Sequence, residues 1–141
     1  MADRYSPAKR SEIMSHVRNR DTEAEIRVRS LLHRLGYRFR LQRRDLPGRP
    51  DIVLSRYKAV IFVHGCFWHQ HFGCSKATLP DRNKEWWAAK LTRNVERDRE
   101  NLEALQNVGW RVATVWECDL KNPRAVISSL AQILPDLKER I

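Results

Sequence analysis

Three of the five histidines and two of the three cysteines of this chain lie within a segment of 11 residues. The segment directly follows an apolar, β-branched run over 60–63, which is typical of a buried strand. Imidazole and thiolate groups bind metal ions and transfer protons, and packing alone rarely gathers so many at one strand end. The pattern predicts an active site beside a metal site, formed by His64, Cys66, His69, His71 and Cys74.

Zinc is the metal that this set of side chains favours. Cys66, His71 and Cys74 share one loop, and Cys118 follows a second predicted strand 44 residues later. Three thiolates and one imidazole make a closed structural zinc site, which would fasten an irregular loop to a distant strand. The alternative is that the three cysteines are ordinary buried thiols.

Asp51, His64 and His69 form a second group. Asp51 begins a short predicted strand and His64 ends its partner, so the two can face each other. A carboxylate and a backbone carbonyl near Val63 offer oxygen ligands to a hard cation such as magnesium, and neutral histidines suit acid–base work. Asp51 is similar in placement to the acid of PD-(D/E)xK nucleases, although residues 62–64 lack their second acid and lysine. The alternative for Asp51 is a cap at the strand start.

Aromatic side chains accompany these groups. Phe67 and Trp68 lie on the same loop, and Trp86–Trp87 open the next predicted helix. Rigid apolar rings beside a basic surface can wedge between base pairs, although one tryptophan of the pair is expected in the core. Lys90 and Asn94 lie one and two turns further on, where they could reach base edges or simply form a solvated helix face.

The elements that must position these groups follow from periodicity and capping. Thr22 and Glu25 form a capping box ahead of a helix that ends at Gly36. The later elements are strands over 37–41, 51–54 and 59–63, a helix over 83–107, a strand over 110–116 and a helix from Asn122, with a short helix from Ser11 before them all. Strands 51–54 and 59–63 are expected to pair as a hairpin. This order predicts an α/β domain with helices on both faces of a sheet.

Two of the predicted helices have a specified inward face. The helix over 83–107 should bury Trp87, Leu91, Val95, Leu102 and Leu105, and its charged middle, 93–100, is a place where it could bend or break. The last helix should bury Val126, Ile127, Leu130 and Ile133.

Composition restricts the partners of the chain. A formal charge of +10 and a pI near 10.2 favour a polyanion, and residues 1–50 hold 13 Lys and Arg against 6 Asp and Glu. No apolar run is long enough to span a membrane, and the polar start is unlike a secretory signal. Three cysteines suit a reducing compartment. We expect a cytoplasmic monomer of one domain, 1–141, in which 1–20 form a basic arm and short helix.

Taken together, these residues resemble the very short patch repair endonucleases, which nick DNA at T·G mismatches left by deamination of 5-methylcytosine. The motifs that carry the resemblance are Arg20-Asp-Thr22 with Glu25, Leu46-Pro-Gly-Arg-Pro-Asp51, His64-Gly-Cys-Phe-Trp-His69 with His71, Asn94-Val-Glu-Arg-Asp98, and Gly109-Trp-Arg-Val112 with Trp116-Glu117. They extend over nearly the whole chain, and the motif from His64 to His69 is highly specific.

The resemblance implies a restriction-endonuclease-like fold, a central mixed sheet flanked by helices with a structural zinc site. It implies magnesium at Asp51, an acid–base role for His69, help from His64 and Glu25 at the phosphate or metal waters, and Asp98 as the partner that orients a histidine. The zinc ligands would be Cys66, His71, Cys74 and Cys118, the intercalating aromatics Phe67, Trp68 and Trp87, and the base-contacting residues Lys90 and Asn94.

The chain departs from the family pattern at two places. Val63 stands where well-known members have Thr, so only a backbone carbonyl remains as a magnesium ligand there. No histidine occupies 70 or 72, which leaves His71 as the imidazole ligand of zinc once His69 is catalytic. For Glu25, the capping box is an alternative explanation.

The expected activity is magnesium-dependent nicking 5′ of the mismatched thymine, in a bacterial cytoplasm at the nucleoid, with other repair proteins as further partners. Two alternatives stay open: a restriction-type endonuclease that cuts paired DNA, and a zinc-stapled DNA-binding module without catalysis.

Overall fold

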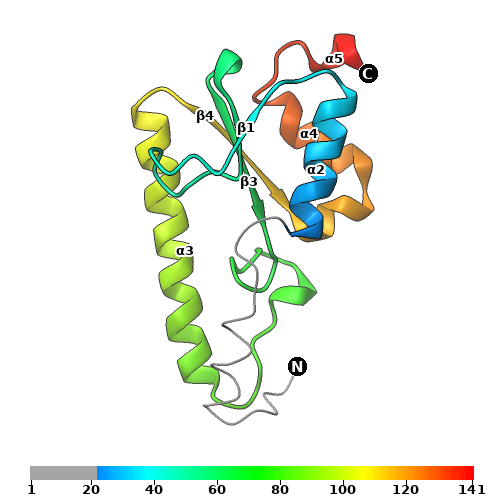
Figure 1. Ribbon diagram of the computed structural model, residues 1–141. Helices are drawn as coiled ribbons and strands as arrows, with labels where there is room; N and C mark the ends of the chain where they lie inside the picture. Colours follow the sequence, from blue (N-terminus) through cyan, green and yellow to red (C-terminus); the bar gives the residue numbers. More distant parts are fainter. Residues whose placement is uncertain (1–21) are drawn as a thin grey trace.

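A computed structural model describes residues 22–141 and shows a four-stranded sheet with helices on both faces (Figure 1). The strands are β1 (Arg40–Leu41), β2 (Ile52–Leu54), β3 (Ala59–His64) and β4 (Arg111–Trp116), in the order β1-β2-β3-β4. β1, β2 and β3 pair antiparallel in turn, whereas β3 and β4 pair parallel, which confirms a mixed sheet and the predicted hairpin. The basic arm and the short helix predicted from Ser11 lie outside the described residues.

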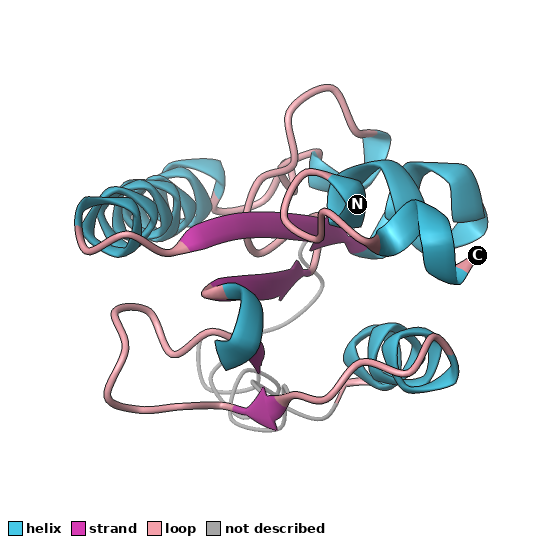
Figure 2. Ribbon diagram, turned by 90° about the horizontal axis from the view of Figure 1, so that it is seen from above, coloured by secondary structure: helices cyan, strands magenta, loops and turns pink. Residues whose placement is uncertain are grey.

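Two helical layers enclose the sheet. Figure 2 shows α3 (Lys84–Asn107) on one face, with α2 (Glu23–Arg34), α4 (Pro123–Ala131) and α5 (Leu137–Arg140) on the other. Because successive strand residues point to opposite faces, the strands supply two separate cores. Ile52, Leu54, Ala59, Ile61, Ala113 and Val115 pack with α2, α4 and α5, whereas Val53 and Val60 pack with Leu105 of α3.

The helix starts follow the predicted capping chemistry. The hydroxyl of Thr22 accepts a hydrogen bond from the backbone N–H of Glu25 at 3.2 Å, and the side chain of Asn122 accepts from the N–H of Arg124 at 3.2 Å. Pro123 occupies the first turn of α4, where its missing N–H is not needed. These contacts confirm the predicted starts of α2 and α4.

Two predictions about regular structure were wrong in extent. The strand predicted over 37–41 is reduced to Arg40–Leu41. In this register residue 38 would face Ser55, where β2 has already passed into the 3₁₀ turn Ser55–Tyr57. α3 does not break in its charged middle and continues for 24 residues. Val95 is 42% exposed rather than inward, and Leu102 only half-buried, because this part of α3 borders a cleft.

The C-terminal helix α5 was not predicted, and a polar cluster attaches it to the rest of the fold. The carboxylate of Asp136 accepts hydrogen bonds from the hydroxyls of Tyr37 and Tyr57, both at 2.7 Å, and from Nε of Arg140 at 3.0 Å. Arg140 also donates to the carbonyl of Leu35 and lies over the ring of Tyr37. This cluster joins α5, α2 and the turn before β3.

The residues predicted to form the active site lie at the opposite end of β3, where the strand ends at His64. His64 and Trp116 are paired at the ends of β3 and β4, and Asp51 lies there because it precedes the antiparallel strand β2. α3 extends beyond the sheet and runs beside the loop that follows β3 (Figure 1). Among residues 22–141, no helix is long and apolar enough to cross a membrane.

Candidate active site and metal centre

Asp51 is held at the end of β3 by the main chain. Its Oδ2 accepts a hydrogen bond from the backbone N–H of Val63 at 2.7 Å. Since the N–H and C=O of one strand residue point to the same side, the carbonyl of Val63 is also directed toward Asp51. Burial and the neighbouring carboxyl of Glu25 raise the pKa of Asp51 well above its ordinary value, although the Val63 N–H and Arg29 act in the opposite direction.

Glu25 belongs to this group as well as to the helix cap. Its backbone is capped by Thr22, but its carboxylate, in a residue only 1% exposed, pairs with Arg29 and accepts from Nε2 of Gln42 at 2.7 Å. The cap therefore accounts for the backbone of Glu25 and leaves its side chain beside Asp51. Two neighbouring carboxyl groups suit a divalent cation with oxygen ligands, and magnesium is one such ion.

The two histidines lie against each other next to α3. The rings of His64 and His69 stack with centroids 3.7 Å apart and planes 4° from parallel. Nδ1 of His69 lies 2.7 Å from Oδ2 of Asp98, one of the acids of α3. Burial and the neighbouring His69 lower the pKa of His64 to about 3, so His64 is neutral at physiological pH.

The contact between His69 and Asp98 sets the chemistry of the imidazole. A carboxylate at Nδ1 keeps the proton on that nitrogen, which leaves Nε2 of His69 as the atom able to accept a proton. His69 and Asp98 are each partly open to water, with side chains 30% and 27% exposed. An imidazole held in this way at the edge of a cleft is able to accept a proton through Nε2.

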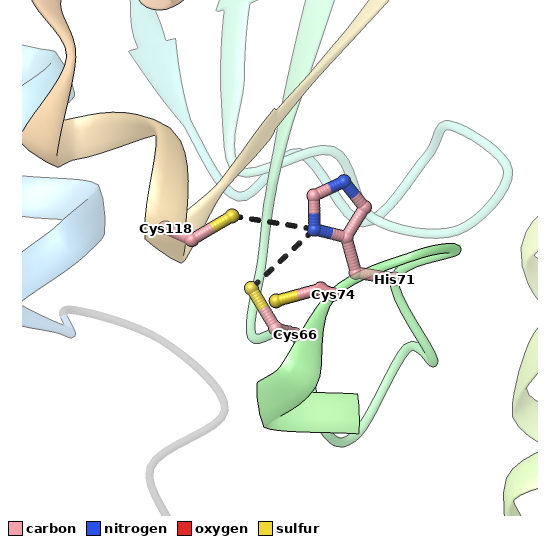
Figure 3. A group of neighbouring side chains, drawn as sticks. All are labelled: Cys66, His71, Cys74 and Cys118. Carbon is pink, nitrogen blue, oxygen red and sulfur yellow. Dashed lines mark hydrogen bonds between the residues drawn. The ribbon is translucent and has the colours of Figure 1, made fainter. Parts of the chain in front are cut away.

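The four sulfur and nitrogen ligands come together as predicted (Figure 3). Nδ1 of His71 lies 3.7 Å from the sulfur of Cys66 and 3.3 Å from that of Cys118, and with Cys74 all four ligand atoms lie within 4.8 Å of one another. Ligands about 2.0 to 2.3 Å from a tetrahedral zinc ion have such separations. The donor set and its spacing therefore fit a metal ion.

The thiols of this cluster differ in how readily they ionise. Burial and the adjacent Cys66 raise the pKa of Cys118, whereas a backbone hydrogen bond from Lys76 and side-chain hydrogen bonds from Cys66 and Cys118 lower that of Cys74. A bound cation would favour the thiolate form of all three, since metal ligation requires thiolates.

The aromatic residues form one cluster between the loop and the start of α3. Phe67, Trp68 and Trp87 lie with ring centroids 5.2 to 5.9 Å apart. Trp87 is 7% exposed and Trp86 43%, which confirms that one tryptophan of the pair is buried. The side-chain amide of Asn94 donates to the backbone carbonyl of Trp68 at 3.1 Å, and Lys90 is half-buried on the same helix.

A cleft of about 2040 Å³ opens over these groups. Its lining includes Glu25, Asp51, His64, His69 and Asp98. Cationic side chains line the same cleft: Arg27, Arg44, Arg49, Lys76, Arg97, Arg99 and Lys121. Acidic and basic groups in one cleft suit a phosphate backbone that is held by cations while one phosphodiester meets a metal ion.

Sequence reasoning missed two residues of this region. Gln42 links Asp51 with Glu25, because its backbone N–H donates to the carbonyl of Asp51 at 3.2 Å and its side chain to Glu25. Trp116 contacts both His64 and His71. No local sequence pattern marks Gln42. Trp116 could have been found from its place at the end of a predicted strand, but only once the parallel register of β3 and β4 is known.

A sheet end with an oriented histidine, paired carboxyls and a basic cleft defines the class of metal-assisted phosphodiesterases acting on nucleic acid. Comparison with known proteins gives the family. The family profile described as DNA mismatch endonuclease Vsr matches residues 2–76, more than half of the chain, and the chain belongs to this family.

Relatives extend the match across the chain. A type II nicking enzyme, V.XorIIP of Xanthomonas oryzae pv. oryzae, is 49% identical over 95% of this chain and 98% of its own length. The DNA mismatch endonuclease Vsr of Escherichia coli is 49% identical over 86% of this chain and 77% of its own length. The type II nicking enzyme V.NmeAIP of Neisseria meningitidis is 39% identical over the full length of both. The protein is therefore an endodeoxyribonuclease, and its substrate is DNA.

Proposed function

We propose that this endonuclease nicks one strand of a T·G mismatch, at the phosphodiester 5′ of the thymine, in a reaction that depends on magnesium. The observation that carries the proposal is the convergence of Asp51, the Val63 backbone and the His69–Asp98 pair on one end of β3 in a member of the Vsr family. The restriction-endonuclease-like fold is part of the same proposal, supported by the mixed sheet with helices on both faces.

The cation site is assigned to Asp51 and the carbonyl of Val63, with Glu25 beside them. When bound there, magnesium would supply positive charge against the charge that develops on the phosphate. Asp51 would bind the cation in a defined position, because the Val63 N–H fixes its carboxylate. Glu25 stays fixed by Arg29 and Gln42 and would hold metal-bound water.

The proton transfer is assigned to His69. Its Nε2 takes one proton of a water molecule whose oxygen forms a bond to phosphorus. The bond between phosphorus and the 3′ oxygen breaks, the 3′ oxygen takes a proton from solvent water and leaves as a 3′-hydroxyl, and the thymine side keeps a 5′-phosphate. Asp98 keeps the proton of His69 on Nδ1 and stabilises the imidazolium that forms. His64 supports the ring of His69 by stacking and, being neutral, does not repel that positive charge.

The zinc site and the aromatic loop are assigned to substrate recognition. Zinc bound by Cys66, His71, Cys74 and Cys118 would keep the loop after β3 rigid, which is what a side chain needs in order to act as a wedge. Phe67, Trp68 and Trp87 are the proposed wedge, and Lys90 and Asn94 the residues that contact bases. Insertion beside the mismatch would separate the aromatic rings that pack together in the free protein.

The deciding experiment is a nicking assay on an end-labelled duplex with one T·G mismatch and its T·A counterpart. Wild type and His69→Ala would be compared with magnesium and after its removal, over a set of flanking sequences. We expect a magnesium-dependent nick in the thymine strand only, ending in a 5′-phosphate, and none from His69→Ala, which should still bind the mismatched duplex. Full activity of His69→Ala would remove its assignment.

The same assay separates the remaining alternatives. Cleavage of both strands of the T·A duplex would place the protein with enzymes that cut paired sites. Salt-sensitive binding without cleavage in any sequence context would indicate a binding module. The bacterial relatives support action at the nucleoid, where we propose that the protein works as a monomer beside other repair proteins. Sedimentation of the protein with and without mismatched duplex tests the monomer.

A further inference from the structure

A column of four aromatic rings connects two groups of side chains. One is the sulfur cluster of Cys66, His71, Cys74 and Cys118, and the other is the pair of histidines, His64 and His69, assigned to catalysis. The ring of His71 stacks on Trp116 with centroids 4.2 Å apart and planes 9° from parallel. The edge of the same indole meets His64 at 5.2 Å and 74°, and His64 in turn stacks on His69. Trp116 is thus in contact with one ring of each group.

The main chain brings Trp116 to this place. In the parallel pairing of β3 and β4, Trp116 is the direct partner of His64, so both side chains project from the same face of the sheet. The N–H of Trp116 donates to Oδ2 of Asp119 at 3.0 Å, where the strand ends and a short 3₁₀ turn, Glu117–Lys121, begins. Cys118 lies in that turn, so the backbone that carries a ligand of the sulfur cluster also carries the indole.

Ring stacking alone leaves the position of His69 incompletely determined. Its hydrogen bond to Asp98 fixes Nδ1, but the ring can still turn about that bond, and stacked rings can slide over each other. A catalytic base must lie close to its productive position, because misplacement by about 1 Å can reduce a rate by about 100-fold. The indole edge opposes movement of His64, which lies between Trp116 and His69.

We propose that Trp116 is a positioning residue. It transmits the fixed position of the metal-bound loop after β3 to the catalytic base, His69. His71, held as a ligand, determines where the indole lies; the indole determines where His64 lies; and His64 supports the ring of His69. The proposal rests on the acid–base role proposed above for His69, and it gives the structural metal a part in the chemical step.

The kinetic test compares Trp116→Leu and Trp116→Phe with Trp110→Leu. Trp110 directly precedes the other end of β4 and packs with the Val53 and Val60 core, so its replacement controls for loss of a large side chain beside the same strand. For Trp116→Leu we expect kcat to fall about 10- to 100-fold while KM stays within about twofold and one zinc per chain is retained. Trp116→Phe, which keeps a flat ring, should recover most of the rate.

A second readout needs no activity. In protein labelled with ¹³C-histidine, the imidazole resonances of His64 and His69 should both shift in Trp116→Leu, and return toward wild type in Trp116→Phe. In Trp110→Leu the same resonances should stay in place. The ring of His69 stacks on His64, and it is His64 that meets the indole, so a shift of the His69 resonances is the signature of transmission through His64.

Defined results overturn the proposal. Unchanged kcat in Trp116→Leu would do so, as would a loss equal to that of Trp110→Leu, or a shift of His64 without one of His69. Where Trp116→Leu fails to retain zinc, Trp116→Met is measured instead, and unfolding of both would make the indole a core residue only. A wild type that nicks no mismatch would remove the proposed function, and the resonances would then decide the role of Trp116.

Discussion

Asp51 and Asp136 are the same residue type in opposite settings at the two ends of β3. Asp136 accepts hydrogen bonds from Tyr37, Tyr57 and Arg140, and these donors lower its pKa to about 2. Asp51 has the N–H of Val63 as its donor, and burial together with Glu25 raises its pKa. The neighbours of Asp136 favour its negative charge, whereas the neighbours of Asp51 oppose it.

The difference separates an end that supports the fold from the end to which we assign the chemistry. A carboxylate surrounded by donors contributes to stability, because folding supplies partners for its charge. A buried carboxyl facing another carboxyl costs stability, and a bound cation offsets that cost. The comparison predicts that substitutions of the two aspartates separate activity from stability.

The largest expected effect is on nicking by Asp51→Asn. This change keeps the shape of the side chain and removes the charge that would bind magnesium, so we expect the nicking rate to fall by about 1000-fold or more. Binding of the mismatched duplex should persist, because the cationic residues around the cleft are unchanged. Single-turnover nicking and a gel-shift titration measure the two quantities.

Asp136→Asn is the matched control for this prediction. It removes a charge of the same kind near the other end of β3. At a temperature where the variant is folded, its nicking rate should stay within about twofold of wild type. Equal losses of activity in the two variants would mean that both aspartates serve only the fold, and the comparison would fail.

The second effect concerns the sulfur cluster of Cys66, His71, Cys74 and Cys118, which follows the same end of β3 as Asp51. Burial and Cys66 raise the pKa of Cys118, as burial and Glu25 raise that of Asp51, and the four candidate ligand atoms lie close enough together to hold one ion. At free zinc about 100 times the dissociation constant, binding stabilises a fold by about 2.7 kcal/mol, and Cys118→Ala should lose that stabilisation. Urea unfolding of wild type and variant, with zinc content measured on each, tests this prediction. A folded wild type without stoichiometric metal would contradict it.

The third effect is an opposite pH dependence of stability at the two ends. The folded state holds a proton on Asp51 where the unfolded chain has released it, so this residue lowers stability as pH rises above about 4. With zinc bound and magnesium absent, Asp51→Asn should gain about 1 to 2 kcal/mol relative to wild type between about pH 5 and pH 8. The stability contributed by Asp136 should instead be lost as pH falls from about 4 toward about 2.

Glu25→Gln sharpens this third prediction. It keeps the Thr22 cap, which bonds to the backbone, and removes the carboxyl that raises the pKa of Asp51. The pH dependence caused by Asp51 should shrink, and nicking should fall. Unchanged nicking would leave Glu25 with a structural role alone.

Residue types and local spacing were enough to predict some of the groupings. All three cysteines of the chain lie together with His71, although Cys118 is 44 residues from Cys74, and this could be predicted because the chain has no other thiol. The hairpin and the Thr22 cap also follow from short-range chemistry. The His69–Asp98 contact, 29 residues apart, was expected only from resemblance to a family.

Contacts that depend on register and on side-chain direction could not be predicted in this way. Trp116 meets His64 because two strands about 50 residues apart pair in parallel with these residues opposite each other. Gln42 reaches Glu25 from a backbone with positive φ, which Gln adopts only when tertiary contacts favour it. Val95 was assigned inward from helical period alone, which does not reveal that α3 extends along a cleft.

The smallest expected effect is that of Tyr37→Phe, which removes one of the three donors to Asp136. Tyr37 is 3% exposed and keeps its packing as Phe, so the change isolates the hydrogen bond. We expect the free energy of unfolding to fall by about 1 kcal/mol, since Asp136 keeps two donors and partial contact with water. The pKa of Asp136 should rise, because its strongest donor is lost, and acid unfolding should begin at higher pH. Nicking should be unaffected, because this cluster lies at the opposite end of β3 from the groups to which we assign catalysis. A fall in nicking as large as the fall caused by Glu25→Gln would show that the two ends of β3 are coupled, and the separation of fold and chemistry would have to be abandoned.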